Sequence, residues 1–302
     1  MKKLLIVCSL LLCSALLTCA QDIAPLLNEL PSDTVFACGI NVAKLSRSPL
    51  FKKYLAASVA QNMKEQLGDK TASDDFAANS AYVLLSSANP SEKNCDIQML
   101  LPPGSEIRKK LTQMKDAVPV KYGSLTASRL PNGAEYVFPS ENRLLLSTAS
   151  LQSFLNAKKG LPKNLRQTFS DSTAFANGFL IVKDSLRRDN PVLAGIERIL
   201  FRLSFADKAE SGFRLSVDIP CLNADAAKQT MMSAQQVQLM IGFLINNTDP
   251  ALAQEFNKTA LLKTEGNTVK IQYLFTEQLI QKFSVLAQSG ALKNMMPEDS
   301  DF

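Results

Sequence analysis

Histidine and tryptophan are both absent from this chain of 302 residues. Histidine is the usual general base beside serine and cysteine nucleophiles, and it is a common ligand of zinc, non-haem iron and haem. Its absence excludes Ser-His-Asp and Cys-His catalysis, His-ligated zinc, two-His-one-carboxylate iron and His-ligated haem. Without tryptophan the chain also lacks the commonest large platform for stacking sugars or bases, and only 5 tyrosines and 16 phenylalanines remain.

The sequence also lacks the short motifs that carry nucleophiles, phosphates or metals. It contains no GxSxG or SxxK spacing, no GxGxxG or GxxxxGK[ST] loop, and no CxxC pair. We therefore predict no catalytic residue, no cofactor and no metal site. A hydrolase that uses two carboxylates or a Ser/Lys arrangement stays open as an alternative, because such groups need no fixed spacing. Its carboxylates Asp74, Asp75, Glu106 and Glu210 are interpreted as solubilising surface groups.

The chain has nearly equal numbers of basic and acidic residues, 33 and 28, so its net charge is small. The chain is 46% hydrophobic and 20% charged, which is typical of a folded domain, and its net charge of +5 falls to +3 when Lys2 and Lys3 are removed. The basic clusters Arg108–Lys110 and Arg187–Arg188 are short and lie among acidic or apolar residues. They indicate solvated helix ends, so no nucleic-acid partner is predicted.

The first 20 residues, MKKLLIVCSLLLCSALLTCA, predict an export signal. Lys2 and Lys3 form a basic start, residues 4–17 are almost entirely apolar, and Thr18-Cys19-Ala20 offers small residues for cleavage before Gln21. The apolar run is shorter than the roughly 18 residues that a membrane anchor needs. We expect an exported protein of the periplasm, the outer envelope or the extracellular space.

A lipoprotein is the third interpretation of this segment. Cys19 follows Leu16-Leu17-Thr18, which resembles a bacterial lipobox except that threonine replaces the usual small residue before the cysteine. Acylation of Cys19 would tether the protein to a membrane surface. Cleavage after Ala20 would instead release a soluble domain, so a membrane partner is expected only if Cys19 is lipidated.

Three cysteines remain after the signal: Cys38, Cys95 and Cys221. Export allows disulfides to persist, and an odd number permits at most one bridge within the chain. Cys38 and Cys95 are the candidate disulfide pair, because both lie in strand-like runs that can be neighbours in one sheet. The alternative is that all three are small buried hydrophobic residues.

Alternating strands predict the sheet type. In residues 201–205 and 213–219, apolar side chains alternate with polar ones, so one face is buried and the other is wet. Short hairpin connections then favour antiparallel pairing. We predict an α+β fold in which mainly antiparallel sheets are covered on one face by amphipathic helices. Arg202 and Arg214 are expected on the wet face, as solvated residues or as contacts to an anion or partner.

The second half of the chain repeats the element order of the first. INVAKLSRSPLF from Ile40 aligns with LIVKDSLRRDNPVL from Leu180 after one insertion, and both halves predict the order β-α-β-β-α-β-β-α. We therefore divide the chain into a signal peptide (1–20), a first α+β repeat (21–160), a second α+β repeat (161–290) and a disordered acidic tail (291–302).

The start of the mature chain, LPSDTVFACGINVAKLSRSPLFKKYL, resembles exported bacterial proteins of unknown function. Those proteins begin with a proline-led turn, a strand and an amphipathic helix, and they contain two loosely similar α+β halves. The resemblance implies a bacterial envelope setting and a non-catalytic role, and it assigns no functional residue.

These observations favour a non-enzymatic envelope or secreted protein that binds an envelope protein, a lipid or a polymer. The helix predicted over 223–246 contains Met231, Met232, Met240 and Phe243, which either pack in the core or line an adaptable apolar groove. An apolar cavity without titratable groups would favour a lipid-binding carrier. Converging buried carboxylates would favour the hydrolase, and a flat polar sheet would favour a protein or polymer partner.

Overall fold

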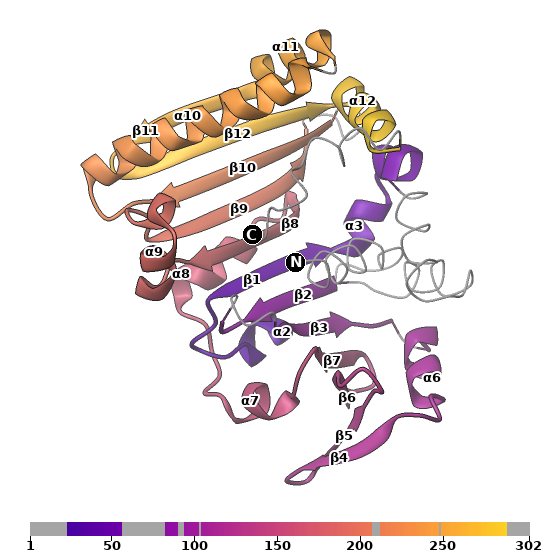
Figure 1. Cartoon of the computed structure of the whole chain (residues 1–302). Coiled ribbons are helices and arrows are strands. Elements are labelled where there is room, and N and C mark those ends of the chain that lie inside the picture. Colours follow the sequence, from indigo (N-terminus) through magenta and orange to yellow (C-terminus); the bar gives the residue numbers. More distant parts are fainter. Residues whose placement is uncertain are drawn as a thin grey trace. The chain divides into compact units, whose positions relative to one another are not determined.

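The structure, a computed structural model, describes residues 23–55, 82–89, 94–102, 104–206, 212–247 and 249–288. The predicted signal peptide with Cys19, most of the helix expected after Pro49, and the acidic tail lie outside these residues. The chain divides into two compact units, Met1–Gly178 and Phe179–Phe302, so the boundary falls inside a strand and later than the division we placed after residue 160. Figure 1 labels the elements of both units, which are described separately.

The first unit is built on an antiparallel sheet with the strand order β1-β2-β3-β7-β6-β5-β4. Its elements are α2 (Ala24–Glu29), β1 (Phe36–Asn41), α3 (Val42–Ser46), η1 (Phe51–Leu55), β2 (Tyr82–Ser87), β3 (Asp96–Leu100), α6 (Glu106–Thr112), β4 (Val118–Tyr122), β5 (Leu125–Arg129), β6 (Glu135–Ser140), β7 (Arg143–Ser147), α7 (Leu151–Asn156), α8 (Lys163–Arg166), η3 (Gln167–Phe169) and the start of β8 (Ala174–Ile181).

Local sequence signals explain several of these boundaries. The Ser150 hydroxyl accepts a hydrogen bond from the amide of Gln152 and caps α7, as predicted from the sequence. In the turn between β5 and β6, the side chain of Asn132 accepts a hydrogen bond from the amide of Ala134. Gly133 lies between these two residues and has a φ of 87°. A positive φ at this position favours glycine, which has no Cβ to clash with the backbone.

The second unit has the strand order β11-β12-β10-β9-β8, again with antiparallel pairs between β9 and β10, β10 and β12, and β11 and β12. Its elements are the end of β8, α9 (Asp184–Asp189), η4 (Pro191–Leu193), β9 (Arg198–Phe205), β10 (Gly212–Pro220), α10 (Ala224–Asn246), α11 (Pro250–Thr259), β11 (Ala260–Glu265), β12 (Thr268–Thr276) and α12 (Glu277–Gln288).

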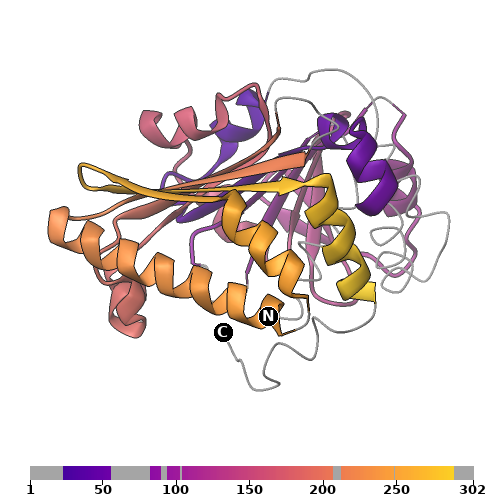
Figure 2. The same cartoon turned by 90° about the horizontal axis from the view of Figure 1, so that it is seen from above.

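The register of the strands in the second unit confirms the fold class read from the alternating strands. Leu215 pairs with Leu203 of β9 and with Tyr273 of β12, which places these three apolar side chains on one face. Figure 2 shows α10, α11 and α12, in orange and yellow, on the same side of the strands of this unit. The protein is therefore α+β, with helices over the apolar face of an antiparallel sheet, as expected.

Each unit contains the predicted element order β-α-β-β-α-β-β-α with additional elements. The first has strands β6 and β7 after its second hairpin, and the second has two helices, α10 and α11, between β10 and β11. The order of the remaining elements is shared. An ancient duplication stays a prediction.

Candidate functional site

Helix α10 of the second unit is anchored at its N-terminal end. The side chain of Asn223 accepts a hydrogen bond from the amide of Ala226 at 2.8 Å and caps the helix. Ala227 is fully buried in a cluster with Ile196, Cys221 and other residues. Gly195 permits a close approach here, because a Cβ at this position would lie 2.6 Å from the Cβ of Ala226.

The C-terminal end of α10 is anchored in a second, separate cluster, in which Ile245 packs with Leu252 and Phe256 of α11 and with Leu279 of α12. Leu252 and Leu279 are fully buried. Asp249 caps α11 by accepting from the amide of Leu252 at 2.9 Å, an interaction that lowers the pKa of its carboxyl together with the nearby charge of Lys282.

Between these two anchors α10 spans an open apolar cavity of about 470 Å³. Such a volume lies within the range of about 300–1,000 Å³ that is typical of small-molecule sites. Side chains of η4, the link from η4 to β9, β9, β10, α10, α11 and β12 line it: Val192, Leu193, Ile196, Ile199, Leu215, Val217, Ile219, Thr230, Ser233, Ala234, Val237, Ile241, Phe256, Ile271, Tyr273 and Phe275.

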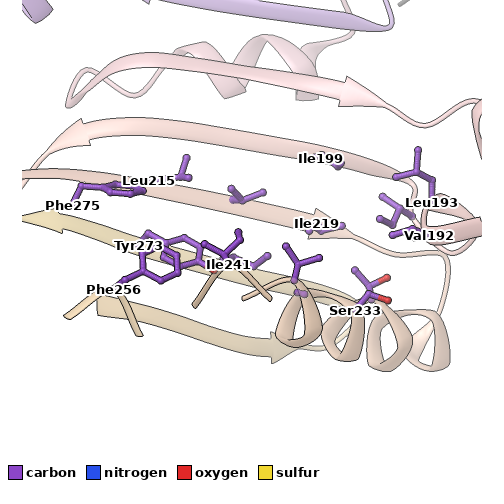
Figure 3. A pocket seen from close by; sticks show the side chains of 16 residues that line it. Val192, Leu193, Ile199, Leu215, Ile219, Ser233, Ile241, Phe256, Tyr273 and Phe275 are labelled. Atoms are coloured by element: carbon purple, nitrogen blue, oxygen red, sulfur yellow. The ribbon is translucent and has the colours of Figure 1, made fainter. Parts of the chain in front are cut away.

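The cavity has two chemically different ends, which Figure 3 shows on opposite sides of the view. One end is aromatic, where the rings of Phe256 and Tyr273 stack with centroids 5.3 Å apart and planes inclined by 14°. The other end is aliphatic and lies near Val192 and Leu193, and the hydroxyl-bearing residue Ser233 is on that side. The site therefore combines a long apolar wall with a few neutral polar groups.

None of the residues that line the cavity carries a charge at neutral pH. Burial raises the pKa of the Tyr273 hydroxyl above its ordinary value, so this group stays neutral. Arg187 of α9 donates from Nε to the backbone oxygen of Ile196 at 3.1 Å, and its Nη1 is 2.6 Å from the carboxylate of Asp184. Arg187, which contacts a lining residue, is thus already paired with an anion.

The four large apolar residues of α10 for which the sequence left open a core or a groove position do not line this cavity. Met232, Met240 and Phe243 are 61%, 57% and 65% exposed, so they lie on the outer side of α10, and Met231 packs against the cluster at the N-terminal anchor. The α10 residues that line the cavity are Thr230, Ser233, Ala234, Val237 and Ile241, and the first four are smaller than methionine. A search for small residues recurring at helical spacing would have found four of them, at 230, 233, 234 and 237.

Arg202 and Arg214 lie on the opposite, polar face of this sheet. Arg202 pairs with Ser216 in the ladder, and its guanidinium is 3.9 Å from the carboxylate of Asp218. On the same face, Glu265 binds both Lys263 and Lys270 at 2.5 Å, and their hydrogen bonds lower the pKa of Glu265 to about 2. Because acidic side chains are interspersed, this face does not present a block of positive charge.

The three described cysteines are free thiols, and the structure does not bring Cys38 and Cys95 together. Cys38 is on β1, opposite Leu85 of β2, whereas Cys95 directly precedes β3 on the far side of β2. Two strand spacings of about 4.8 Å separate them, beyond the Cα separation of about 7 Å that a disulfide can span. Cys95 and Cys221 are buried, as expected of small hydrophobic residues.

In the first unit a buried carboxylate, Glu135, is held in a structural network. It is 0% exposed and accepts hydrogen bonds from Tyr122, from Arg129 Nε at 2.9 Å and Nη2 at 2.7 Å, and from the amide of Leu151 at 2.8 Å. Burial alone would raise the pKa of Glu135, but these donors outweigh it and the pKa is lowered. The carboxylate joins β4, β5, β6 and α7, and all its acceptor positions are used.

A second carboxylate, Asp96, lies two strands from Glu135 in the same row of the sheet, since Ser147 pairs with both residues. Burial raises the pKa of Asp96, against the opposing effects of a hydrogen bond with Ser147 and of the charge of Lys159. Lys159 donates to the backbone oxygen of Phe154 and lies over its ring. Asp96 and Lys159 are thus engaged with a hydroxyl of the sheet and with Phe154, so the hydrolase alternative gains no support from them.

Two further searches were restricted to the described residues. They contain no group of three or more cysteine, aspartate or glutamate side chains placed to hold a metal ion. Among them, no helix is both long enough and apolar enough to cross a membrane.

No protein-family model matches the chain, and no curated protein matches it. Among solved structures, crystal form III of TP0453 superimposes with a TM-score of 0.51 at 14% identity, covering 86% of this chain and 98% of that one. Crystal form I of the same protein gives a TM-score of 0.47 at 13% identity, with coverage of 86% and 96%. The chain thus shares the fold of TP0453.

Proposed function

We propose that this protein is an exported, non-enzymatic binding protein that carries an apolar small molecule, such as a lipid chain, in the cavity beneath α10. The observation that carries the proposal is the 470 Å³ cavity, which is lined almost entirely by aliphatic and aromatic side chains. A site of this kind, with a few convergent polar groups, is the usual form of a small-molecule pocket.

The construction of the cavity supports the same function. Well-packed cores leave few voids, because lining atoms without neighbours lose dispersion contacts. Here α10 is fixed at Ala227 and at Ile245, while residues between the anchors, such as Val237, remain 48% exposed although they face the cavity. A ligand would restore the missing contacts and bury these side chains.

The test is binding of Nile red, a neutral fluorescent dye, and its displacement by lipids extracted from the native host. Ala234→Phe places a ring in the cavity and is expected to weaken dye binding at least tenfold, because the ring occupies the ligand's space. Gln235→Phe adds the same ring to the exposed side of α10 and serves as the matched control. Ser233→Phe repeats the block if Ala234→Phe fails to fold.

Circular dichroism establishes that each variant is folded before binding is compared. Equal dye affinity in Ala234→Phe, Ser233→Phe and Gln235→Phe would contradict the proposal, and so would a wild-type protein that binds no dye.

Export is the second part of the proposal and rests on residues 1–20. Mass spectrometry of the protein purified from its native host is expected to show a mature N-terminus at Gln21, or an acylated Cys19 if the lipoprotein interpretation holds. A mature protein that retains Met1 would contradict export. Acylated Cys19 would place the carrier at a membrane surface, whereas cleavage before Gln21 would make it soluble.

A further inference from the structure

The cavity also indicates which apolar molecules it accepts. Building on the proposed carrier function, we propose that it selects an elongated single-chain molecule with a neutral hydrogen-bonding group, such as a fatty alcohol or fatty ester. The ionised head of a fatty acid is excluded from it. Three properties of the cavity support this selection: its length, its lack of charge, and the placement of its hydroxyl groups.

The cavity is longer than a compact ring ligand requires. It follows β10 from Leu215 to Ile219, a distance of about 14 Å at 3.4 Å per residue. Along α10 it extends from Thr230 to Ile241, about 16 Å at 1.5 Å per residue. The aromatic and aliphatic ends lie at opposite extremes of this length (Figure 3). A linear chain fits such a space without leaving a large part of the wall uncovered.

The lining offers no charge to balance an ionised ligand. Moving a carboxylate or an ammonium group into apolar surroundings is far more costly than moving a neutral polar group, unless an opposite charge pairs with it. Arg187, which contacts the backbone of the lining residue Ile196, is already paired with Asp184. At the aromatic end, Glu255 accepts a hydrogen bond from Thr276, and Lys282 lies beside Asp249.

The hydroxyl groups define where a neutral polar group would lie. Thr230 and Ser233 are one helical turn apart on the same face of α10, and both line the cavity. Cys221 Sγ lies 3.5 Å from Thr230 Oγ1 and 3.4 Å from the backbone oxygen of Ile219, and its single hydrogen can be donated to one of them at a time. In the described residues no hydrogen bond occupies the hydroxyl of Ser233. A ligand hydroxyl or ester carbonyl at this end would find both a donor and an acceptor.

The experiment compares three probes of the same chain length, 1-decanol, decanoate and decylammonium, as competitors of Nile red at pH 7.5. We expect 1-decanol to bind at least tenfold more tightly than either ion. The double variant Thr230→Val with Ser233→Ala is expected to weaken the binding of 1-decanol by about threefold to tenfold, the range of a lost hydrogen bond.

Ser233→Lys supplies the missing cation and is expected to reverse the order, so that decanoate binds more tightly than 1-decanol. Gln235→Lys, on the exposed side of α10, is the control and should keep the wild-type order. Equal affinities of the three probes for the wild-type protein would overturn the selectivity and leave the carrier function intact, since the heads would then lie in solvent. A protein that binds neither Nile red nor any probe would overturn both.

Discussion

The two units place helices of very different length after a corresponding hairpin. Helix α6 of the first unit has 7 residues and helix α10 of the second has 23, about 10 Å and 35 Å at 1.5 Å per residue. The end of α6 is fastened to the sheet by Tyr136, whose hydroxyl donates to the backbone oxygen of Leu111 at 2.6 Å. A short helix can be fixed along its whole length, whereas a long helix can be fixed at its ends and leave space in the middle.

The chemistry of the space beside each helix differs accordingly. The pocket beside α6 has a volume of about 310 Å³, and its lining includes the hydroxyl-bearing side chains of Thr112, Thr126, Ser128 and Tyr136. The cavity under α10 is larger and nearly all of its lining is apolar. The comparison teaches that the first unit uses polar side chains such as Glu135 and Tyr136 for internal structure, whereas the second leaves an apolar surface open beside α10.

Loss of the polar network of the first unit is expected to have the largest effect on stability. Glu135→Ala removes a buried acceptor of four hydrogen bonds and leaves Tyr122 and the amide of Leu151 without it, at a cost of about 3 kcal/mol. The measurement is the free energy of unfolding in urea. Nile red binding by the folded variant should match wild type, because Glu135 belongs to the other unit.

The exposed residue Glu141 provides the control for this prediction. Glu141→Ala should change the free energy of unfolding by less than about 0.5 kcal/mol. A similar, small change for Glu135→Ala would show that the network is not structural and would reopen an active role for its carboxylate.

An intermediate effect is expected at the N-terminal anchor of α10. In Gly195→Val the new Cβ would collide with the Cβ of Ala226, so the helix end must move, at a cost of about 1–3 kcal/mol in unfolding free energy. Nile red affinity should fall as well, because the anchor sets the width of the cavity. Ala194→Val changes the exposed neighbouring residue and should affect neither measurement. Unchanged dye binding in Gly195→Val would show that the anchor does not define the site.

Much of the fold could be predicted from the sequence, because its signals are local. Alternation in residues 213–219 predicted the apolar and polar faces of β10, and the serine at position 150 predicted the start of α7. The boundary between the two compact units has no such local signal. It falls inside β8, a continuous strand, and no glycine- or proline-rich linker marks a division there.

The cavity itself could not be predicted, because it depends on tertiary packing. An empty space under α10 arises from contacts at two distant points, Gly195 against Ala226 and Ile245 against Leu252, which no local pattern encodes. Large flexible apolar residues usually face a core or a groove, but Met232, Met240 and Phe243 face outward here. The position of Cys38 relative to Cys95 depends on tertiary structure in the same way. Strand order decides which cysteines are neighbours, and β2 lies between β1 and β3.

The smallest effect separates the buried carboxylate of Glu135 from the half-buried carboxylate of Asp96 by the sign of their pH dependence. The pKa of Glu135 is lowered in the folded protein, so its stabilising contribution is present above its ordinary pKa of 4.5 and is lost as pH falls through the folded value. Burial raises the pKa of Asp96 above its ordinary 3.8, so its ionised form costs stability, and this cost disappears as pH falls. Asp96→Asn should therefore be more stable than wild type at pH 7, and this advantage should vanish near pH 3.5. Urea unfolding of both proteins at the two pH values measures it. If Asp96→Asn were more stable than wild type by the same amount at pH 7 and at pH 3.5, the assignment would be contradicted, because an effect that does not depend on charge does not change with pH. Glu135→Gln should show the opposite sign, with a loss of stability mainly at pH 7.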